Sequence, residues 1–190
     1  MANKTTIFCT PFITPLLRFV ARAILKVCGW RVNAKPFSDK KLVIIGAPHT
    51  SNWDFTLMLC AVLDAEVPLN WMGKHSIFSF PFGPLMRWLG GIPVVRYKGN
   101  NTVQSIIDIF NERDELIILL SPEGTRAANS PWKSGFYRIA AAVNVPIVLG
   151  YIDGELKQCG FEEYYYPSGD YEKDLVEIQA FYTGIKGIKH

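Results

Sequence analysis

The chain has 190 residues, of which 49% are hydrophobic and 19% charged, and its formal net charge is +3. This length predicts one domain, residues 1–190, with a substantial core, and the composition excludes a disordered chain. Four scattered cysteines without a CxxC pair, and only three histidines, predict neither a disulfide framework nor a metal site. Cys28 and Cys60 lie in apolar stretches, so we expect both to be buried, and we expect no nucleic-acid partner.

The basic charge is concentrated at the start of the chain. Residues 1–41 carry eight basic side chains and one acidic side chain, a net +7, which indicates an anionic partner at this end. Residues 12–28 predict a helix in which Arg18, Arg22 and Lys26 form one narrow basic stripe on an otherwise apolar surface. This pattern is typical of an amphipathic helix lying in a membrane interface, and its apolar runs are too short to span a bilayer. The alternative is a core helix that packs its broad apolar face on the domain and turns the stripe to water.

Strand and helix patterns alternate along the rest of the chain. Strands are expected at 30–32, 42–45, 67–73, 91–96, 116–120 (the apolar centre of the sheet), 146–152 and, at an edge, 162–166. Helices are expected at 55–63, 102–113, 136–143 and 171–182. The alternation predicts an α/β fold with a mixed, mostly parallel sheet flanked by helices, and residues 42–152 form its core. Residues 76–90, rich in aromatic residues, are either core or the wall of a groove for a long apolar ligand.

His49 and Asp54 lie on the connection between the first apolar strand and the helix that follows it. Two residues five apart on one helix or one strand point apart, so these two side chains can meet only if the backbone turns between them. An aspartate that accepts a hydrogen bond from one imidazole nitrogen fixes the tautomer and leaves the other nitrogen as a general base. The alternative is that Asp54 only stabilises the start of the helix, next to an N-cap at Ser51 or Asn52.

Two further loops with charged side chains also follow predicted strands. The carboxyl ends of neighbouring parallel strands meet along one edge of an α/β sheet. Arg96 and Arg126 could bind a phosphate there, and Gly124 would let the backbone approach a ligand closely. Taken singly, a surface ion pair is the favoured interpretation of Arg96 and a solvated loop acid that of Glu123, and only their convergence with His49 favours a binding site.

Four blocks, in this order along the chain, resemble the motifs of the glycerolipid acyltransferases, which include the 1-acylglycerol-3-phosphate acyltransferases. They are His49-x4-Asp54, Gly91-Ile-Pro-Val-Val-Arg96, Ser121-Pro-Glu-Gly-Thr-Arg126 and Val145-Pro-Ile-Val148. The second block departs from the commoner Phe-Ile-x-Arg form, and the fourth lacks the second proline often found there. The resemblance implies that His49 is the general base, that Asp54 orients it, and that the acceptor is held by Arg96, Glu123, Gly124, Thr125 and Arg126.

The activity implied by this resemblance is transfer of a fatty acyl group from an acyl thioester to a hydroxyl group. The donor would be acyl-CoA or acyl carrier protein, and the acceptor a lysophospholipid such as 1-acylglycerol-3-phosphate, without a metal or cofactor. The protein would attach, as a peripheral or monotopic protein, to anionic lipids on the cytoplasmic face of a membrane. The alternatives are a phosphate-free acceptor, such as an aminolipid or glycolipid, and a non-catalytic membrane-binding module.

Three other enzyme hypotheses remain open at this point. His75 could be the base in place of His49, although it has no acid at a helpful spacing. A hydrolase could use Ser51 or Ser121 as its nucleophile, but the chain has no G-x-S-x-G motif. A thioesterase would result if water replaced the acceptor beside His49.

Overall fold

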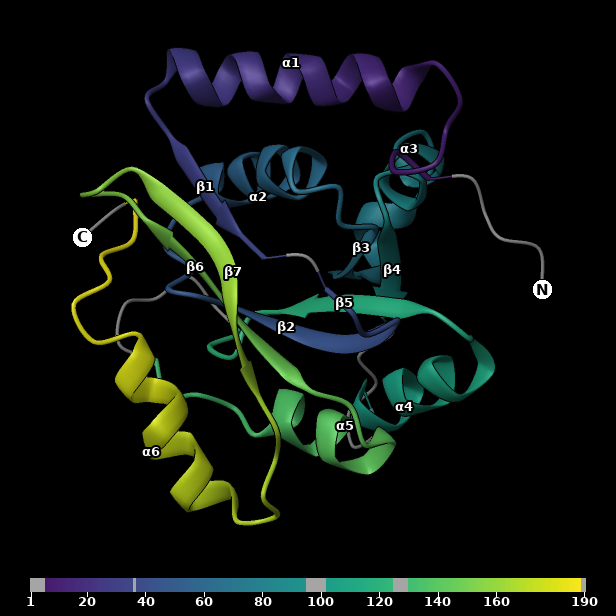
Figure 1. Cartoon of the computed structure of the whole chain (residues 1–190). Helices are drawn as coiled ribbons and strands as arrows, with labels where there is room; N and C mark the ends of the chain where they lie inside the picture. Colours follow the sequence, from purple (N-terminus) through teal and green to yellow (C-terminus); the bar gives the residue numbers. More distant parts are fainter. Residues whose placement is uncertain (1–5, 36, 95–101, 125–129, 189–190) are drawn as a thin grey trace.

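A mixed sheet with the strand order β1-β7-β6-β2-β5-β3-β4 runs through the computed structural model of this protein (Figure 1). The structure describes residues 6–35, 37–94, 102–124 and 130–188. Within these residues the strands are β1 (Arg31–Ala34), β2 (Lys41–Ala47), β3 (Leu69–Lys74), β4 (Gly91–Val94), β5 (Leu116–Leu120), β6 (Ile147–Asp153) and β7 (Gln158–Tyr165). The pairing of β6 with β7 is antiparallel, and the five other pairings are parallel. The predicted α/β fold with a mostly parallel sheet is confirmed.

One expectation about the sheet was wrong: the middle strand is β2, and the apolar strand β5 lies next to it. The strand expected at the edge, 162–166, falls largely in the second half of the longer β7. Strand β1 pairs only with residues 158–161 of β7, so no strand pairs with the outer side of residues 162–165 among the described residues. Strand β1 is only four residues long, so its sequence pattern could not indicate which strand it pairs with. In the structure, Val32 of β1 pairs with Cys159 of β7.

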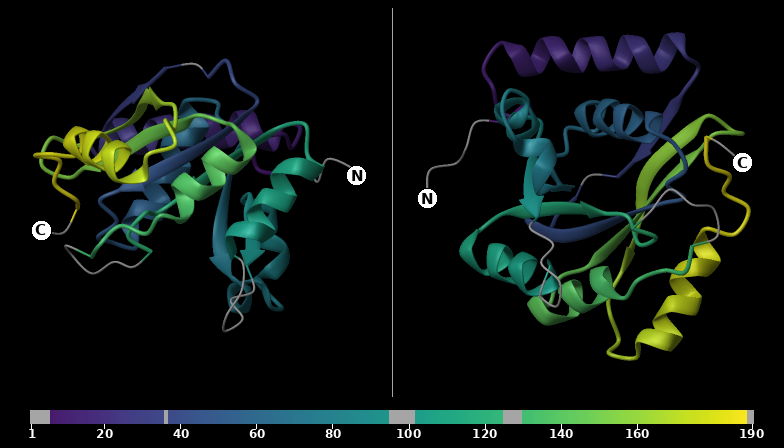
Figure 2. Two further views of the ribbon diagram at one scale, coloured as in Figure 1. Left: turned by 90° about the horizontal axis from the view of Figure 1, so that it is seen from below. Right: turned by 180° about the vertical axis from the view of Figure 1, so that it is seen from behind.

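The helices form separate layers on the two faces of the sheet (Figure 2). They are α1 (Ile13–Val27), α2 (Trp53–Asp64), α3 (Gly83–Trp88), α4 (Thr102–Glu112), α5 (Gly135–Val143) and α6 (Tyr171–Phe181), with a short 3-10 helix at His75–Phe78. Helices α4, α5 and α6 cover one face, whereas α2 covers the other and α1 lies over α2 as a further layer (Figures 1 and 2). The stretch 76–90 thus forms two short helices, which its Pro and Gly residues interrupt.

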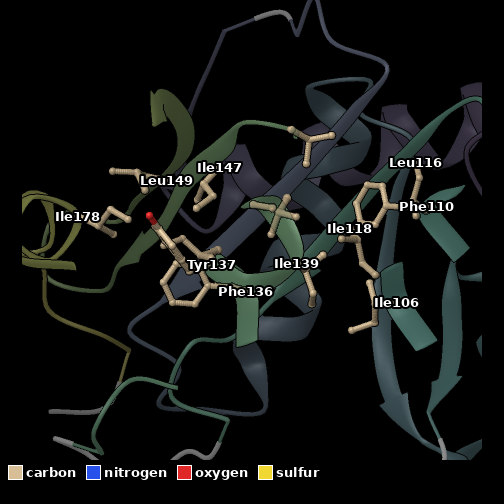
Figure 3. Close-up of a cluster of buried hydrophobic side chains, with 14 of the residues drawn as sticks. Ile106, Phe110, Leu116, Ile118, Phe136, Tyr137, Ile139, Ile147, Leu149 and Ile178 are labelled. Atoms are coloured by element: carbon tan, nitrogen blue, oxygen red, sulfur yellow. The ribbon is translucent and has the colours of Figure 1, made fainter. Parts of the chain in front are cut away.

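Aliphatic and aromatic side chains fill the space between the sheet and the α4–α5 layer. Phe110 of α4 and Ile139 of α5 are buried against Ile118 and Ile147 of the sheet (Figure 3). Apolar residues recur at helical spacing on α4 and on α5, so that each helix presents one apolar face to the strands.

Helix α2 carries apolar residues on nearly every side, because the sheet covers one side of it and α1 covers the other. Met58 and Val62 pack with the sheet residue Ile44, whereas Leu57 and Cys60 belong to the cluster shared with α1. A helix that is apolar on every side is expected only where it is buried on every side. The expected burial of Cys60 is confirmed, but that of Cys28 was wrong, because Cys28 lies exposed at the end of α1.

Helix α1 packs on α2 through a narrow strip and leaves its broad apolar surface uncovered. Its buried residues are Thr14, Ala21 and Leu25. The uncovered apolar side chains, which we call the open face of α1, are Phe12 (92% exposed), Ile13, Leu16, Phe19 (71%), Val20, Ile24 and Val27 (87%). The expectation of a core helix with its broad apolar face on the domain was therefore wrong.

The basic stripe of α1 faces acidic side chains at the end of α2 and just beyond it. Arg18 pairs with Glu66 at 3.0 Å, and Arg22 pairs with Asp64, the last residue of α2, at 2.7 Å. These ion pairs favour the rotation of α1 in which the open face points away from α2. An amphipathic helix on a soluble core normally directs its charges to water, whereas α1 directs two of its three cations to acids of the domain.

Candidate active site

The connection from β2 to α2 brings an imidazole and a carboxylate together. The Nδ1 atom of His49 lies 2.9 Å from Oδ2 of Asp54. The same carboxylate oxygen accepts hydrogen bonds from the N–H groups of Thr50 and Ser51, each at 2.8 Å. Since a carboxylate accepts, the hydrogen lies on Nδ1 and the lone pair on Nε2. The pair is thus arranged for general base catalysis at Nε2.

Burial of the two side chains differs in a way that suits these roles. The side chain of Asp54 is 7% exposed and that of His49 is 31% exposed. Within the described residues Oδ1 of Asp54 has no hydrogen-bond partner, and Asp54 also lines a cavity. The N-cap at Asn52 makes no side-chain bond, whereas Ser51 Oγ accepts from the Trp53 N–H at 3.2 Å. The carboxylate therefore organises the loop before the helix and does not merely cap it.

Glu123 joins this site from the strand next to β2. It follows β5, which runs parallel to β2, and its Oε2 accepts a hydrogen bond from the His49 N–H at 3.1 Å. Burial raises the pKa of Glu123, although the hydrogen bond from His49 opposes that change. The carboxylate thus holds the backbone of the catalytic loop, a contact that its motif position did not indicate.

An apolar cavity of about 180 Å³ opens beside His49 and Asp54, between α2 and the sheet. Its walls include Phe55 and Met58 of α2 and Trp71 of β3. Further apolar lining comes from Leu119, Ile152 and Phe161. Residues 76–90, considered as a groove wall, do not line this cavity, because their two short helices lie beyond β3. The cavity suits an apolar chain that ends at the imidazole.

The predicted acceptor residues are placed only in part. Arg96, Thr125 and Arg126 lie outside the described residues. Strand β4, which precedes Arg96 in the sequence, ends at Val94. In the sheet β4 lies three strand positions from β2, which is a distance of about 14 Å. Gly124 is exposed and has a φ of 64°, a conformation that favours glycine.

Lys133 is a cation beside this loop that the motifs did not reveal. A Cβ atom at Gly124 would lie 2.9 Å from the Lys133 ammonium, and the Lys133 N–H donates to the Pro122 carbonyl at 2.9 Å. Within the described part of the chain Lys133 has no ion-pair partner. Sequence analysis could not identify this cation, because no motif contains Lys133.

Backbone N–H groups of these loops would be the nearest donors to an oxyanion on the substrate, but most of them already have acceptors. The N–H groups of His49, Thr50 and Ser51 already donate to carboxylates, and that of Gly124 donates to the Ser121 carbonyl at 3.2 Å. None of these four groups is therefore available to a substrate oxygen in this arrangement. Nor do the described His, Cys, Asp and Glu side chains gather in threes as metal ligands would.

The competing bases and nucleophiles lack the necessary partners. His75 is exposed in the 3-10 helix, and no acid pairs with it among the described residues. Ser51 Oγ bonds to the Trp53 N–H, and Ser121 Oγ is buried without a hydrogen-bond partner in the same part of the chain. Neither hydroxyl is activated by an imidazole, so a serine nucleophile is disfavoured.

Comparison with known proteins assigns the family. The family model described as Acyltransferase matches residues 31–151, which hold His49, Asp54 and Glu123. The fold is similar to the crystal structure of the 1-acyl-sn-glycerophosphate (LPA) acyltransferase PlsC from Thermotoga maritima, with a TM-score of 0.60 over 89% of this chain and 76% of that one, at 15% identity. No curated protein matches the chain in sequence. Because the family model covers most of the chain, this protein belongs to the acyltransferase family, as the sequence motifs predicted.

Proposed function

We propose that this acyltransferase moves a fatty acyl group from an acyl thioester to the hydroxyl of a lysophospholipid such as 1-acylglycerol-3-phosphate. The observation that carries the proposal is the His49–Asp54 pair at the mouth of an apolar cavity. A base alone would suit many reactions, but a base beside an apolar cavity suits one in which the reacting carbonyl ends a hydrocarbon.

The transfer is direct and needs no covalent acyl-enzyme. Nε2 of His49 takes the proton of the acceptor hydroxyl as its oxygen attacks the thioester carbonyl, and Asp54 stabilises the resulting imidazolium. The carbon–sulfur bond breaks as the tetrahedral intermediate collapses, and the thiol leaves with the proton. The donor is acyl-CoA or acyl carrier protein, since both present the same thioester.

The acceptor phosphate is bound by cations from the loops beyond β4 and β5. Arg96 and Arg126 are assigned this role by their motif positions, together with Thr125 and the backbone at Gly124. Lys133 supplies a further cation next to Gly124. A phosphate-free acceptor, such as an aminolipid or glycolipid, would not require this set of cations.

The experiment that tests the proposal is lipid mass spectrometry of products formed from mixed lysolipids and labelled acyl thioesters. We expect labelled acyl groups in a diacyl phospholipid with the phosphate acceptor preferred. Labelled free fatty acid without lysolipid consumption would indicate a thioesterase instead. Labelled aminolipid or glycolipid as the main product would identify the alternative acceptor.

We further infer that the open face of α1 docks on anionic membranes, on the cytoplasmic face. Its exposed apolar residues fit the acyl boundary of a bilayer, and the net +7 charge of residues 1–41 favours anionic headgroups. Among the described residues, no helix is long and apolar enough to span a membrane. Such docking would bring the site close to its lipid acceptor.

Vesicle flotation tests this docking. The double variant Leu16→Ser, Phe19→Ser removes two exposed apolar side chains of α1, and we expect it to lose binding to phosphatidylglycerol-containing vesicles. Val176→Ser, which removes a 68% exposed apolar side chain from α6, is the matched control and should still bind. Retained flotation of the double variant would refute the docking proposal.

A further inference from the structure

The segment after α6, residues 184–188, returns to the catalytic loop. Gly187 is buried, and a Cβ atom there would lie 2.5 Å from both Cγ2 and Oγ1 of Thr50. Only glycine permits this approach, because real Cβ atoms do not come so close to other heavy atoms. Thr50 is the residue between His49 and Ser51, so the segment packs directly against the loop that carries the base.

The same segment is tied to the turn between β6 and β7. The Gly154 N–H donates to the Lys186 carbonyl at 2.7 Å, and Lys186 pairs with Glu155 at 2.7 Å. A Cβ atom at Gly154 would lie 2.7 Å from the Gly187 carbonyl oxygen. These contacts hold residues 184–188 against the turn, and the same segment packs on Thr50.

One residue further on, Ile188 packs against the cluster between α1 and α2. That cluster contains Leu25 of α1 and Leu57 of α2. The segment is thus anchored on both sides of Gly187, by the hydrogen bond at Lys186 and by apolar packing at Ile188. A segment held at two points resists displacement of the residue between them.

We propose that Gly187 is a positioning residue for acyl transfer, acting through Thr50 on the His49–Asp54 pair. This inference rests on the proposed function, because it needs that pair to be the base. The N–H of Thr50 is one of three donors to Oδ2 of Asp54, so displacement of Thr50 moves a donor that orients the carboxylate. Misplacement of catalytic groups by about 1 Å costs about 10²-fold in rate.

The test is a double-mutant cycle at Gly187 and Thr50. Gly187→Ala adds one methyl group whose three nearest atoms all belong to the Thr50 side chain, Cγ2 and Oγ1 at 2.5 Å and Cβ at 3.1 Å. Thr50→Ala removes the two nearest atoms and keeps Cβ, so it relieves the two severe contacts and leaves one that a small shift can accommodate. We expect Gly187→Ala to lower kcat about 10- to 100-fold with little change in KM for the thioester. The double variant should recover most of the kcat of Thr50→Ala.

Gly135→Ala is the matched control, because a Cβ atom there meets only Val103 Cγ2, at an ordinary 3.7 Å. It should leave kcat and the unfolding temperature unchanged. An unchanged kcat for Gly187→Ala, or a loss that merely follows the folded fraction measured by circular dichroism, would overturn the inference. So would a double variant no more active than Gly187→Ala. A wild-type protein without acyl transfer would instead contradict the proposed function, which separates the two failures.

Discussion

Two of the three buried aspartates in the described part of the chain, Asp54 and Asp174, each accept three hydrogen bonds, and only Asp54 lies in the candidate active site. Asp174 accepts from the Tyr137 hydroxyl at 2.7 Å, the Ser168 hydroxyl at 2.6 Å and the Ser168 N–H at 2.7 Å, so that both of its oxygens are satisfied. Asp54 receives its three donors on one oxygen and has none on the other within the described residues.

The number of hydrogen bonds to a carboxylate therefore does not identify a catalytic residue. Asp174 bonds to groups that do not exchange protons near neutral pH and joins α5 to α6. Asp54 bonds to an imidazole and borders a cavity. Substrate access and a titratable partner mark the catalytic carboxylate, and the following predictions separate the two aspartates on this basis.

Of the two aspartates, the larger effect on kcat is expected from Asp54→Asn. The asparagine keeps the volume but removes the negative charge that stabilises the imidazolium, so kcat should fall about 10²-fold or more. Because two backbone N–H donors can still bond to the amide oxygen, the unfolding temperature should change little. Steady-state kinetics beside thermal unfolding measures both, and a kcat close to wild type would remove Asp54 from the mechanism.

Asp174→Asn should show the opposite behaviour. Burial alone would raise the pKa of Asp174, but the hydrogen bonds from Ser168, Tyr137 and Tyr165 outweigh it and lower the pKa from 3.8 to about 2. A depressed pKa stabilises the folded state above the unfolded-state value, here by about 2 kcal/mol, and that contribution disappears as pH falls from about 4 to 2.

We therefore expect Asp174→Asn to lower the unfolding temperature by about 4–8 °C at pH 7 while kcat per folded molecule is retained. The steep loss of wild-type stability between about pH 4 and 2 should be weaker in the variant. Thermal unfolding across this pH range provides the check. A pH dependence equal to that of wild type would contradict the role given to Asp174.

A smaller effect is expected at Glu123, and it distinguishes support of the loop from binding of the acceptor. Glu123→Ala leaves the His49 N–H without its acceptor, so kcat should fall about tenfold, whereas Glu123→Gln keeps an acceptor oxygen and should lose less. If Glu123 instead holds the acceptor, as the motif resemblance implies, the acceptor KM will rise in both variants while kcat changes little.

The sequence predicted those parts of the site that depend on local geometry. His49 and Asp54 are five residues apart, so a strand-to-helix turn suffices to join them. The contact from Glu123 to the His49 N–H crosses 74 residues and depends on β2 and β5 being neighbours, which no local pattern encodes.

The same limit explains the errors in the fold. The helical period of residues 12–28 identified which residues share a face, but the direction of that face depends on Asp64 at the end of α2 and on Glu66 just after it. The pairing of residues 158–161 of β7 with β1 could not be predicted, because β1 is only four residues long. Gly187 had no signal in sequence, because its function depends on a contact with Thr50.

The most direct measurement is kcat for transfer of a labelled acyl group to a lysophospholipid by His49→Ala, compared with His75→Ala and wild type. Removal of the general base should lower kcat by about 10²–10⁴-fold, with both variants folded and bound to vesicles as wild type is. His75 is exposed and unpaired with any described acid, so His75→Ala should retain wild-type activity. Transfer by His49→Ala within a few-fold of wild type would contradict the assignment of the base.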